Sequence, residues 1–137
     1  PILAMKAIQA GLDLILEVGM PALRKQSIAL TSAFIDQAES ELRDLGFEVS
    51  TPLDPDRRGS HVSLKHQHAS RINQALIHPP DGGPAIIPDF RAPDNIRFGF
   101  APLYNSHDEV EQTIVRLRQI VERQWYLQVD PPGHEVT

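Results

Sequence analysis

The feature that most limits how this chain can fold is a long apolar stripe between two glycines, Gly19 and Gly46. Apolar and small side chains recur there at steps of three and four residues, which predicts a helix of about 25 residues. Pro21 suits the first turn, and Gly46 suits the end, because glycine accepts the left-handed conformation that follows a last turn. The stripe consists of Ile28, Thr31, Ile35, Ala38, Leu42 and Leu45, and it is widened by Leu23, Leu30 and Phe34.

The segment before this stripe, residues 2–18, shows the same periodicity and predicts an amphipathic helix. Lys6, Asp13 and Glu17 are spaced so that one side of this helix stays in water. The segment has no basic region in front of its apolar residues and no initiating methionine, so it does not resemble a signal peptide. Because the chain begins at Pro1, we expect it to be a piece of something longer.

Two more helices follow from capping and breaking signals. Residues 70–77 fit a short helix that is stopped by Pro79 and Pro80. Ser106 and Glu109 have the spacing of a capping box, in which each side chain satisfies an exposed backbone N–H of the other residue. The last helix therefore begins here, with a buried stripe at Val110, Ile114, Leu117 and Val121.

Four short stretches have the residue types and turns that are typical of strands: residues 47–50, 61–66, 85–90 and 96–100. Too few of them are linked by helices for a doubly wound parallel sheet. The predicted fold class is therefore α+β, or a two-layer α/β arrangement, with a small mixed or antiparallel sheet covered by helices. We expect residues 1–125 to form the domain and residues 126–137 to be a frayed tail.

The composition excludes several classes of protein. The 18 acidic and 13 basic residues give a net charge of −5, which argues against a nucleic-acid-binding protein. No apolar run approaches the roughly 20 residues that span a bilayer. The chain has no cysteine, which excludes disulfides, a thiolate zinc site and a cysteine nucleophile. We therefore expect a cytoplasmic protein without a membrane or nucleic-acid partner.

The polar residues of the middle region suggest few sites. His61, His66 and His68 lie close together, but no HExxH pair and no carboxylate at metal-ligand spacing accompanies them, so we predict no metal site. The turn "DGGP" at residues 81–84 has no phosphate-loop pattern. Other candidates lie in the loop after residue 50. Asp54 and Asp56 could serve as paired carboxylates, but aspartates flanked by proline are more typical of solvated turn residues. Arg57 and Arg58 form either an anion clamp or a solvated or ion-paired loop tip.

Arg97 is the strongest candidate for a binding residue. In an extended strand, Ile96 and Phe98 face the core, while Arg97 and Gly99 share the other face. The missing side chain of Gly99 leaves space beside a guanidinium, whose planar fork of N–H donors matches a carboxylate. The alternative is an ion pair with an aspartate nearby in sequence, and spacing alone does not decide between the two. The aspartates concerned are Asp89, Asp94 and Asp108.

Three stretches together resemble one enzyme family, and the specific part is "DFRAPDNIRFGFAPLYNS" at residues 89–106. With "TPLDPDRRGSHVSLKH" and the opening "PILAMKAIQAGLDLILEVGMPALRKQS", this segment is similar to the C-terminal portion of kynureninases. The resemblance runs from Pro1 to about Val121. It implies the small domain of a fold-type-I enzyme that uses pyridoxal phosphate and works as a homodimer, with the cofactor held by the large domain.

The resemblance also implies an activity and one site residue. Kynureninases hydrolyse a carbon–carbon bond of kynurenine or 3-hydroxykynurenine in tryptophan breakdown, releasing anthranilate or 3-hydroxyanthranilate together with alanine. Arg97 matches the family residue that holds the α-carboxylate of the substrate. Lys6, Lys25 and Lys65 do not lie in the family's Schiff-base motif, so the resemblance implies no catalytic residue in this chain and no activity for the chain alone.

Two alternatives to this function remain open from the sequence. The first is a stand-alone module that binds a small carboxylate or a partner protein. The second is another enzyme of the same cofactor superfamily, such as an aminotransferase or a desulfurase, which also places an arginine in its small domain. The segment around Arg97 favours kynureninase over this second alternative.

Overall fold

The computed structural model describes residues 2–129. Helix α1 (Ile2–Val18) leads into α2 (Met20–Glu41), and a four-stranded sheet and two further helices follow. A 3-10 turn precedes β1, a second one lies between β1 and β2, and a third closes the described part of the chain. The remaining elements are β1 (Glu48–Val49), β2 (His61–Lys65), α3 (Ala69–Ile77), β3 (Asp89–Arg91), β4 (Asn95–Gly99), α4 (His107–Glu122) and the 3-10 turns Arg43–Leu45, Pro55–Arg57 and Trp125–Leu127.

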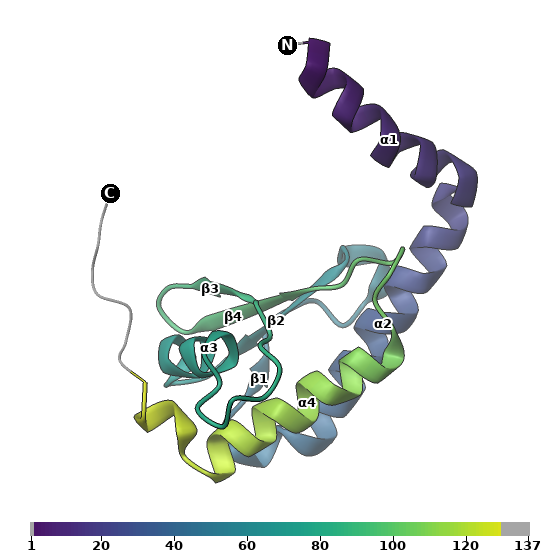
Figure 1. Ribbon diagram of the computed structural model, residues 1–137. Helices are drawn as coiled ribbons and strands as arrows, with labels where there is room; N and C mark the ends of the chain where they lie inside the picture. The colour runs from purple at the N-terminus through teal and green to yellow at the C-terminus, as the bar shows by residue number, and fades with distance from the viewer. Residues whose placement is uncertain (1, 130–137) are drawn as a thin grey trace.

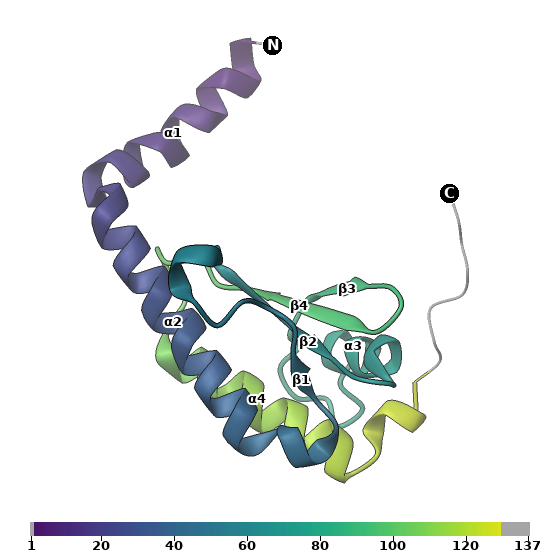
Figure 2. The ribbon, with the colours of Figure 1, turned by 180° about the vertical axis from the view of Figure 1, so that it is seen from behind.

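The sheet is antiparallel throughout, with strand order β1-β2-β4-β3. Helices α2 and α4 lie side by side along one side of it, as both ribbon views show (Figures 1 and 2). The predicted α+β class with a small sheet covered by helices is confirmed. The other face of the sheet is left without a covering helix within the described residues (Figure 1). Side chains that point to this face, such as Ser63 and Arg97, are polar.

The turn between α1 and α2 and the end of α2 both depend on glycine. Gly19 has a φ angle of 81° and Gly46 one of 90°, in the region that other residues rarely adopt. The α-helix ends at Glu41, earlier than the stripe predicts, because the last turn tightens into the 3-10 turn Arg43–Leu45. This tighter turn brings Phe47 back into the core, where 5% of it is exposed.

The core forms where the helical stripes meet the alternating strand residues. Phe34 is fully buried at its centre, and its ring lies 5.1 Å from the rings of both Phe98 and Phe100. These contacts join α2 to β4 and to the residue just after it. The largest fully buried side chains are Phe34, Leu30, Leu42, Leu64, Ile72, Leu76, Ile96, Ile114, Leu117, Ile120, Val62 and Val110.

Helix α1 has the predicted helical conformation, but its apolar side is not buried in this chain. It contacts α2 and extends away from the rest of the domain (Figures 1 and 2). Ile8 is 68% exposed and Leu16 is 69% exposed. Among the described residues, no helix combines the length and the apolar character that crossing a membrane requires.

The third strand begins later than the sequence indicates. We predict it at residues 85–90, whereas β3 spans Asp89–Arg91. The backbone N–H of Ile86 donates to the carbonyl of Leu76, outside the sheet, and Pro88 has no N–H to donate. The prediction for residues 85–88 is therefore wrong, since one hydrogen bond to α3 and a proline without an N–H take the place of the strand ladder there.

The frayed tail predicted for residues 126–137 falls in its larger part, residues 130–137, outside the described residues. The beginning of that stretch is packed: Tyr126 stacks on His68 with ring centroids 4.9 Å apart.

Burial of His66 predicts a loss of stability in weak acid. Its Nε2 lies 3.1 Å from the carbonyl of Leu45 and its Nδ1 accepts from the N–H of His68, so the neutral ring fits both partners. Burial lowers the pKa of His66, and the hydrogen bond to Leu45 opposes this only in part. In the unfolded chain the imidazole of His66 has its ordinary pKa of about 6.5. Near and below that pH the unfolded chain therefore binds more protons than the folded chain.

We therefore expect the free energy of unfolding to decrease as the pH is lowered from about 7 to 5. Urea denaturation across this range measures the effect. Replacing His66 by Gln should remove most of the slope, whereas replacing the exposed His61 by Gln should leave it. A slope that persists in His66→Gln would contradict this account.

A candidate anion-binding site on the open face of the sheet

The alternation predicted around Arg97 is present in β4. Ile96 is fully buried and Phe98 is 4% exposed, while the side chain of Arg97, on the opposite face, is 36% exposed. No atom lies within 4 Å of the place where a Cβ of Gly99 would stand. The guanidinium therefore lies on the open face of the sheet, with empty space along the same strand.

The ion pair that the sequence left as an alternative is also present. Arg97 stands opposite Asp89 in the β3–β4 register, and its Nη2 donates to the Asp89 carboxylate. Arg91 donates to the same oxygen from Nε at 2.8 Å, and its Nη2 lies 2.8 Å from that oxygen in an ion pair. Asp94 instead accepts a hydrogen bond from Asn95 at 2.7 Å.

Asp89 is ionised in this arrangement. Partial loss of hydration raises the pKa of its carboxyl group, but the hydrogen bonds and positive charges of Arg91 and then Arg97 outweigh this and lower the pKa below its ordinary value. One carboxylate therefore lies between two guanidinium groups, and the cluster keeps a net positive charge.

The Arg97 guanidinium borders a hollow of about 340 Å³ on the open face, which we call the arginine hollow. Polar and basic side chains from β2, β4 and the loop before β2 dominate its wall. In a chain of net charge −5, this is a local concentration of positive charge suited to an anionic ligand. The lining residues are Ser50, Thr51, Pro52, Arg57, Arg58, Gly59, His61, Ser63, Arg91, Asn95 and Arg97.

The two arginines considered as an anion clamp, Arg57 and Arg58, have different roles. Arg58 is 9% exposed, and its guanidinium donates to Thr31 Oγ1 at 3.2 Å, to Ser32 Oγ at 2.6 Å and to the carbonyl of Leu53. It thus fastens the loop to α2. Arg57 is exposed at the edge of the hollow. Neither alternative, an anion clamp or a solvated or ion-paired loop tip, describes Arg58, because its guanidinium is buried and donates to neutral oxygens of the fold.

Further bonds hold the same loop in place. Ser60 Oγ lies 2.7 Å from Ser27 Oγ on α2, and Arg24 donates to the carbonyl of Pro55. Asp54 caps the 3-10 turn by accepting from the N–H of Asp56 at 3.0 Å, the solvated turn role that the sequence favours for this acidic pair. The loop that walls the hollow is therefore a fixed part of the domain.

The three clustered histidines are separated by the fold. His61 lines the arginine hollow, whereas His66 is buried against Phe47 with ring centroids 4.6 Å apart. His68 lies between His66 and Tyr126. Within residues 2–129, the structure brings no three His, Asp or Glu side chains together in a way that could hold a metal ion.

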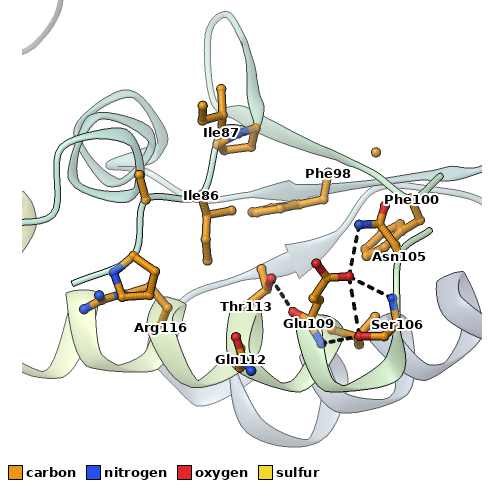
Figure 3. A pocket seen from close by; sticks show the side chains of 15 residues that line it. Ile86, Ile87, Phe98, Phe100, Asn105, Ser106, Glu109, Gln112, Thr113 and Arg116 are labelled. Carbon is orange, nitrogen blue, oxygen red and sulfur yellow. Dashed lines mark hydrogen bonds between the residues drawn. The ribbon is translucent and has the colours of Figure 1, made fainter.

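A second hollow, of about 350 Å³, lies on the other side of β4 (Figure 3). Ile86 and Phe98 face the first turns of α4 there, and the Glu109 carboxylate points toward Ser106. Glu109 accepts from the Ser106 N–H at 2.8 Å, and Ser106 Oγ accepts from the Glu109 N–H at 3.2 Å, which confirms the predicted capping box. The hydrogen bond from the Ser106 N–H, and then the one from the Asn105 side chain, lower the pKa of Glu109. The carboxylate is thus engaged in capping the helix.

The "DGGP" turn contributes Pro84 to the wall of this second hollow and is held by Arg116. Asp81 accepts from Arg116 Nη1 at 2.7 Å and from the Gly83 N–H at 3.1 Å. Arg116 is 7% exposed, and its guanidinium also lies 5.5 Å from the centre of the Trp125 ring. The sequence indicates a turn here but not its attachment to α4, because the pairing partner lies 35 residues away.

Gly83→Ala is expected to destabilise the protein. A Cβ at Gly83 would stand 2.0 Å from Arg116 Nη2, so the guanidinium would have to leave its carboxylate and its place beside Trp125. Because Gly83 is only partly buried and the guanidinium is the end of a flexible side chain, we expect a loss of about 0.5–1 kcal/mol, the usual worth of a partly exposed ion pair. Gly99→Ala is the matched control, since its Cβ would meet nothing within 4 Å, and its unfolding midpoint should barely change. Equal midpoints for the two variants would contradict the role of Arg116.

The resemblance implies pyridoxal phosphate, whose aldehyde requires a lysine amine. The arginine hollow does not fit that attachment, because no lysine among the described residues lines it. Lys6 lies on α1, Lys25 is exposed on α2, and Lys65 lies at the end of β2. The basic side chains here suit an anionic group rather than covalent attachment of a cofactor.

The fold and the hollow define a small α+β domain that presents arginines on the open face of an antiparallel sheet, beside an unburied helix. Comparison with known proteins specifies this class further. Residues 23–117 match the family model described as the kynureninase C-terminal domain, and the chain belongs to the kynureninase family.

The relatives that match are longer proteins. Kynureninases of Bacillus thuringiensis subsp. konkukian and Deinococcus radiodurans are 33% and 37% identical over 129 and 121 residues, which is 94% and 88% of this chain. That of Pseudomonas fluorescens is 37% identical and covers 100% of this chain. The aligned region is 29%, 28% and 32% of these three proteins, so the chain corresponds to less than a third of their length.

Proposed function

We propose that this chain is the C-terminal, substrate-orienting part of a pyridoxal-phosphate-dependent kynureninase. Such an enzyme adds water across the Cβ–Cγ bond of kynurenine or 3-hydroxykynurenine, releasing anthranilate or 3-hydroxyanthranilate and alanine. Residues 1–125 would form the small domain with the helix that leads into it. The single observation that carries the proposal is Arg97, a guanidinium on the open face of the sheet beside a hollow in a kynureninase C-terminal domain.

Arg97 is proposed to hold the α-carboxylate of the substrate. A planar guanidinium binds a carboxylate through charge-assisted hydrogen bonds that fix both its position and its plane. When bound, pyridoxal phosphate supplies the electron sink for bond cleavage. The contribution of this chain is orientation, since a carboxylate held in one place limits how the scissile bond of the substrate can lie.

The exposed face of α1 supports a proposal about partners. Met5, Ile8, Leu12 and Leu16 are 67%, 68%, 49% and 69% exposed. Apolar side chains gathered on one helix in this way are typical of a surface that another protein segment covers. We therefore propose that the chain functions within a larger kynureninase that contains the cofactor lysine, as a homodimer in the cytoplasm.

A chimera tests the proposal. This chain would replace the corresponding C-terminal part of the Pseudomonas fluorescens relative, which matches it over its whole length. We expect the chimera to bind pyridoxal phosphate, measured by its absorbance, and to convert kynurenine to fluorescent anthranilate with release of alanine. The isolated chain should do neither. A chimera that binds the cofactor but releases neither anthranilate from kynurenine nor 3-hydroxyanthranilate from 3-hydroxykynurenine would refute the proposed function.

A further inference from the structure

Asp89 has an unusual position for a surface aspartate next to a candidate binding residue. It lies on β3 directly opposite Arg97 on β4, at one end of the tight hairpin formed by residues 89–97. The register of two paired strands fixes the distance between their backbones, so the carboxylate cannot move away from Arg97 without a change in the hairpin. The contact is therefore built into the sheet.

The contact leaves much of Arg97 available. The Asp89 carboxylate accepts from Nη2, and among residues 2–129 neither Nε nor Nη1 of Arg97 has a hydrogen-bond partner. A guanidinium has five N–H donors, so donors remain for a second carboxylate. Asp89 thus holds one side of the group and leaves the other side directed at solvent and the hollow.

Arg91 prevents Asp89 from neutralising Arg97. It approaches the same carboxylate oxygen with two donors at 2.8 Å, from the same strand as Asp89. Two guanidinium groups and one carboxylate carry a net charge of +1. A second carboxylate arriving at Arg97 therefore meets an attractive field, although a carboxylate is already bound there.

We propose that Asp89 is a positioning residue for Arg97, held in place and partly charge-balanced by Arg91. It restricts the rotation of a long side chain that would otherwise have to be ordered when the ligand binds. The inference rests on the proposed function, in which Arg97 receives the substrate α-carboxylate. It adds that the affinity for this carboxylate depends on the Arg91–Asp89–Arg97 cluster and not on Arg97 alone.

The test compares kynurenine with its decarboxylated analogue, the same molecule without the α-carboxylate, used as a competitive inhibitor of the chimera. We expect Asp89→Asn to raise the KM for kynurenine about tenfold, because the positioning contact loses its charge, with kcat changed less than about twofold. The inhibition constant of the analogue should not change, because the analogue does not use Arg97. Asp94→Asn, the same substitution in the same hairpin, is the matched control and should change neither constant.

Three results would overturn the inference. An unchanged KM for kynurenine in Asp89→Asn would show that Asp89 does not position Arg97, and a lowered KM would show that its charge opposes binding of the carboxylate. An equal loss of affinity for kynurenine and analogue would indicate a general structural defect. Should Asp89→Asn not fold, Arg91→Gln decides, since the Arg91 side chain is 58% exposed. It should raise the KM for kynurenine and spare the analogue, and no change would also overturn the inference. An Arg97→Ala arm separates the two proposals: if it does not reduce the preference for kynurenine over the analogue, the proposed function fails, whatever Asp89 does.

Discussion

Replacing Arg97 by alanine in the chimera is expected to lower kcat/KM for kynurenine by at least about a hundredfold. The substitution removes the charge-assisted hydrogen bonds proposed for the α-carboxylate and allows the reacting bond to shift. The fold should tolerate it, because the Arg97 side chain is 36% exposed and Asp89 keeps its pairing with Arg91. Cofactor absorbance and the thermal midpoint of the chimera should therefore match those of the unmodified chimera.

Arg97→Lys is the informative control for this prediction. Lysine keeps the positive charge but replaces a planar fork with a single ammonium, so it should recover part of the loss and leave an elevated KM. Steady-state turnover of kynurenine, followed by anthranilate fluorescence, measures both constants. If Arg97→Ala retains kcat/KM within about threefold, the carboxylate contact must lie elsewhere, because even one charge-assisted hydrogen bond is worth more than that.

The sequence predicts the orientation of Arg97 because strand alternation is a local property. Ile96, Arg97 and Phe98 point to alternate faces whatever the strand pairs with. The capping box at Ser106 and Glu109 is local in the same sense, since the two residues are three positions apart. Features of this kind are encoded within a few residues and need no knowledge of the fold.

The hydrogen-bond and ion-pair partners of the arginines depend on the fold, so the sequence alone does not identify them. The sequence offers Asp89, Asp94 and Asp108 as partners for Arg97, and strand register selects the first. For Arg58, the partners Thr31 and Ser32 lie 27 and 26 residues away on α2, so nothing local distinguishes it from exposed Arg57. The two adjacent arginines look alike in the sequence, yet Arg58 has a structural role and Arg57 faces solvent.

The exposed side of α1 shows a different limit of sequence reasoning. Its periodicity correctly predicts an amphipathic helix, yet periodicity states only that one side avoids water, not which part of which protein covers it. Leu30 on α2 is fully buried by this chain, whereas Leu16 on α1 is 69% exposed. The two stripes look alike in sequence and differ in their surroundings.

The largest expected effect on stability comes from Phe34→Ala. Phe34 is fully buried, and its ring lies 5.1 Å from those of Phe98 and Phe100, at the centre of the contact between α2 and the sheet. Removing the ring loses its transfer free energy and leaves a cavity among rigid neighbours, which costs about 3–5 kcal/mol. That is a large part of the roughly 5–15 kcal/mol by which domains are stable.

Urea denaturation followed by circular dichroism measures this loss, with Leu16→Ala as the matched control. Leu16 is also an apolar residue on a helix, but it is 69% exposed, so its truncation should change the free energy of unfolding by less than about 0.5 kcal/mol. A loss below about 1 kcal/mol in Phe34→Ala would mean that the three rings do not form the core. Because Phe98 follows Arg97 on β4, the cavity should also loosen the strand that presents the guanidinium. In the chimera, Phe34→Ala should therefore raise the KM for kynurenine even at temperatures where the variant remains folded.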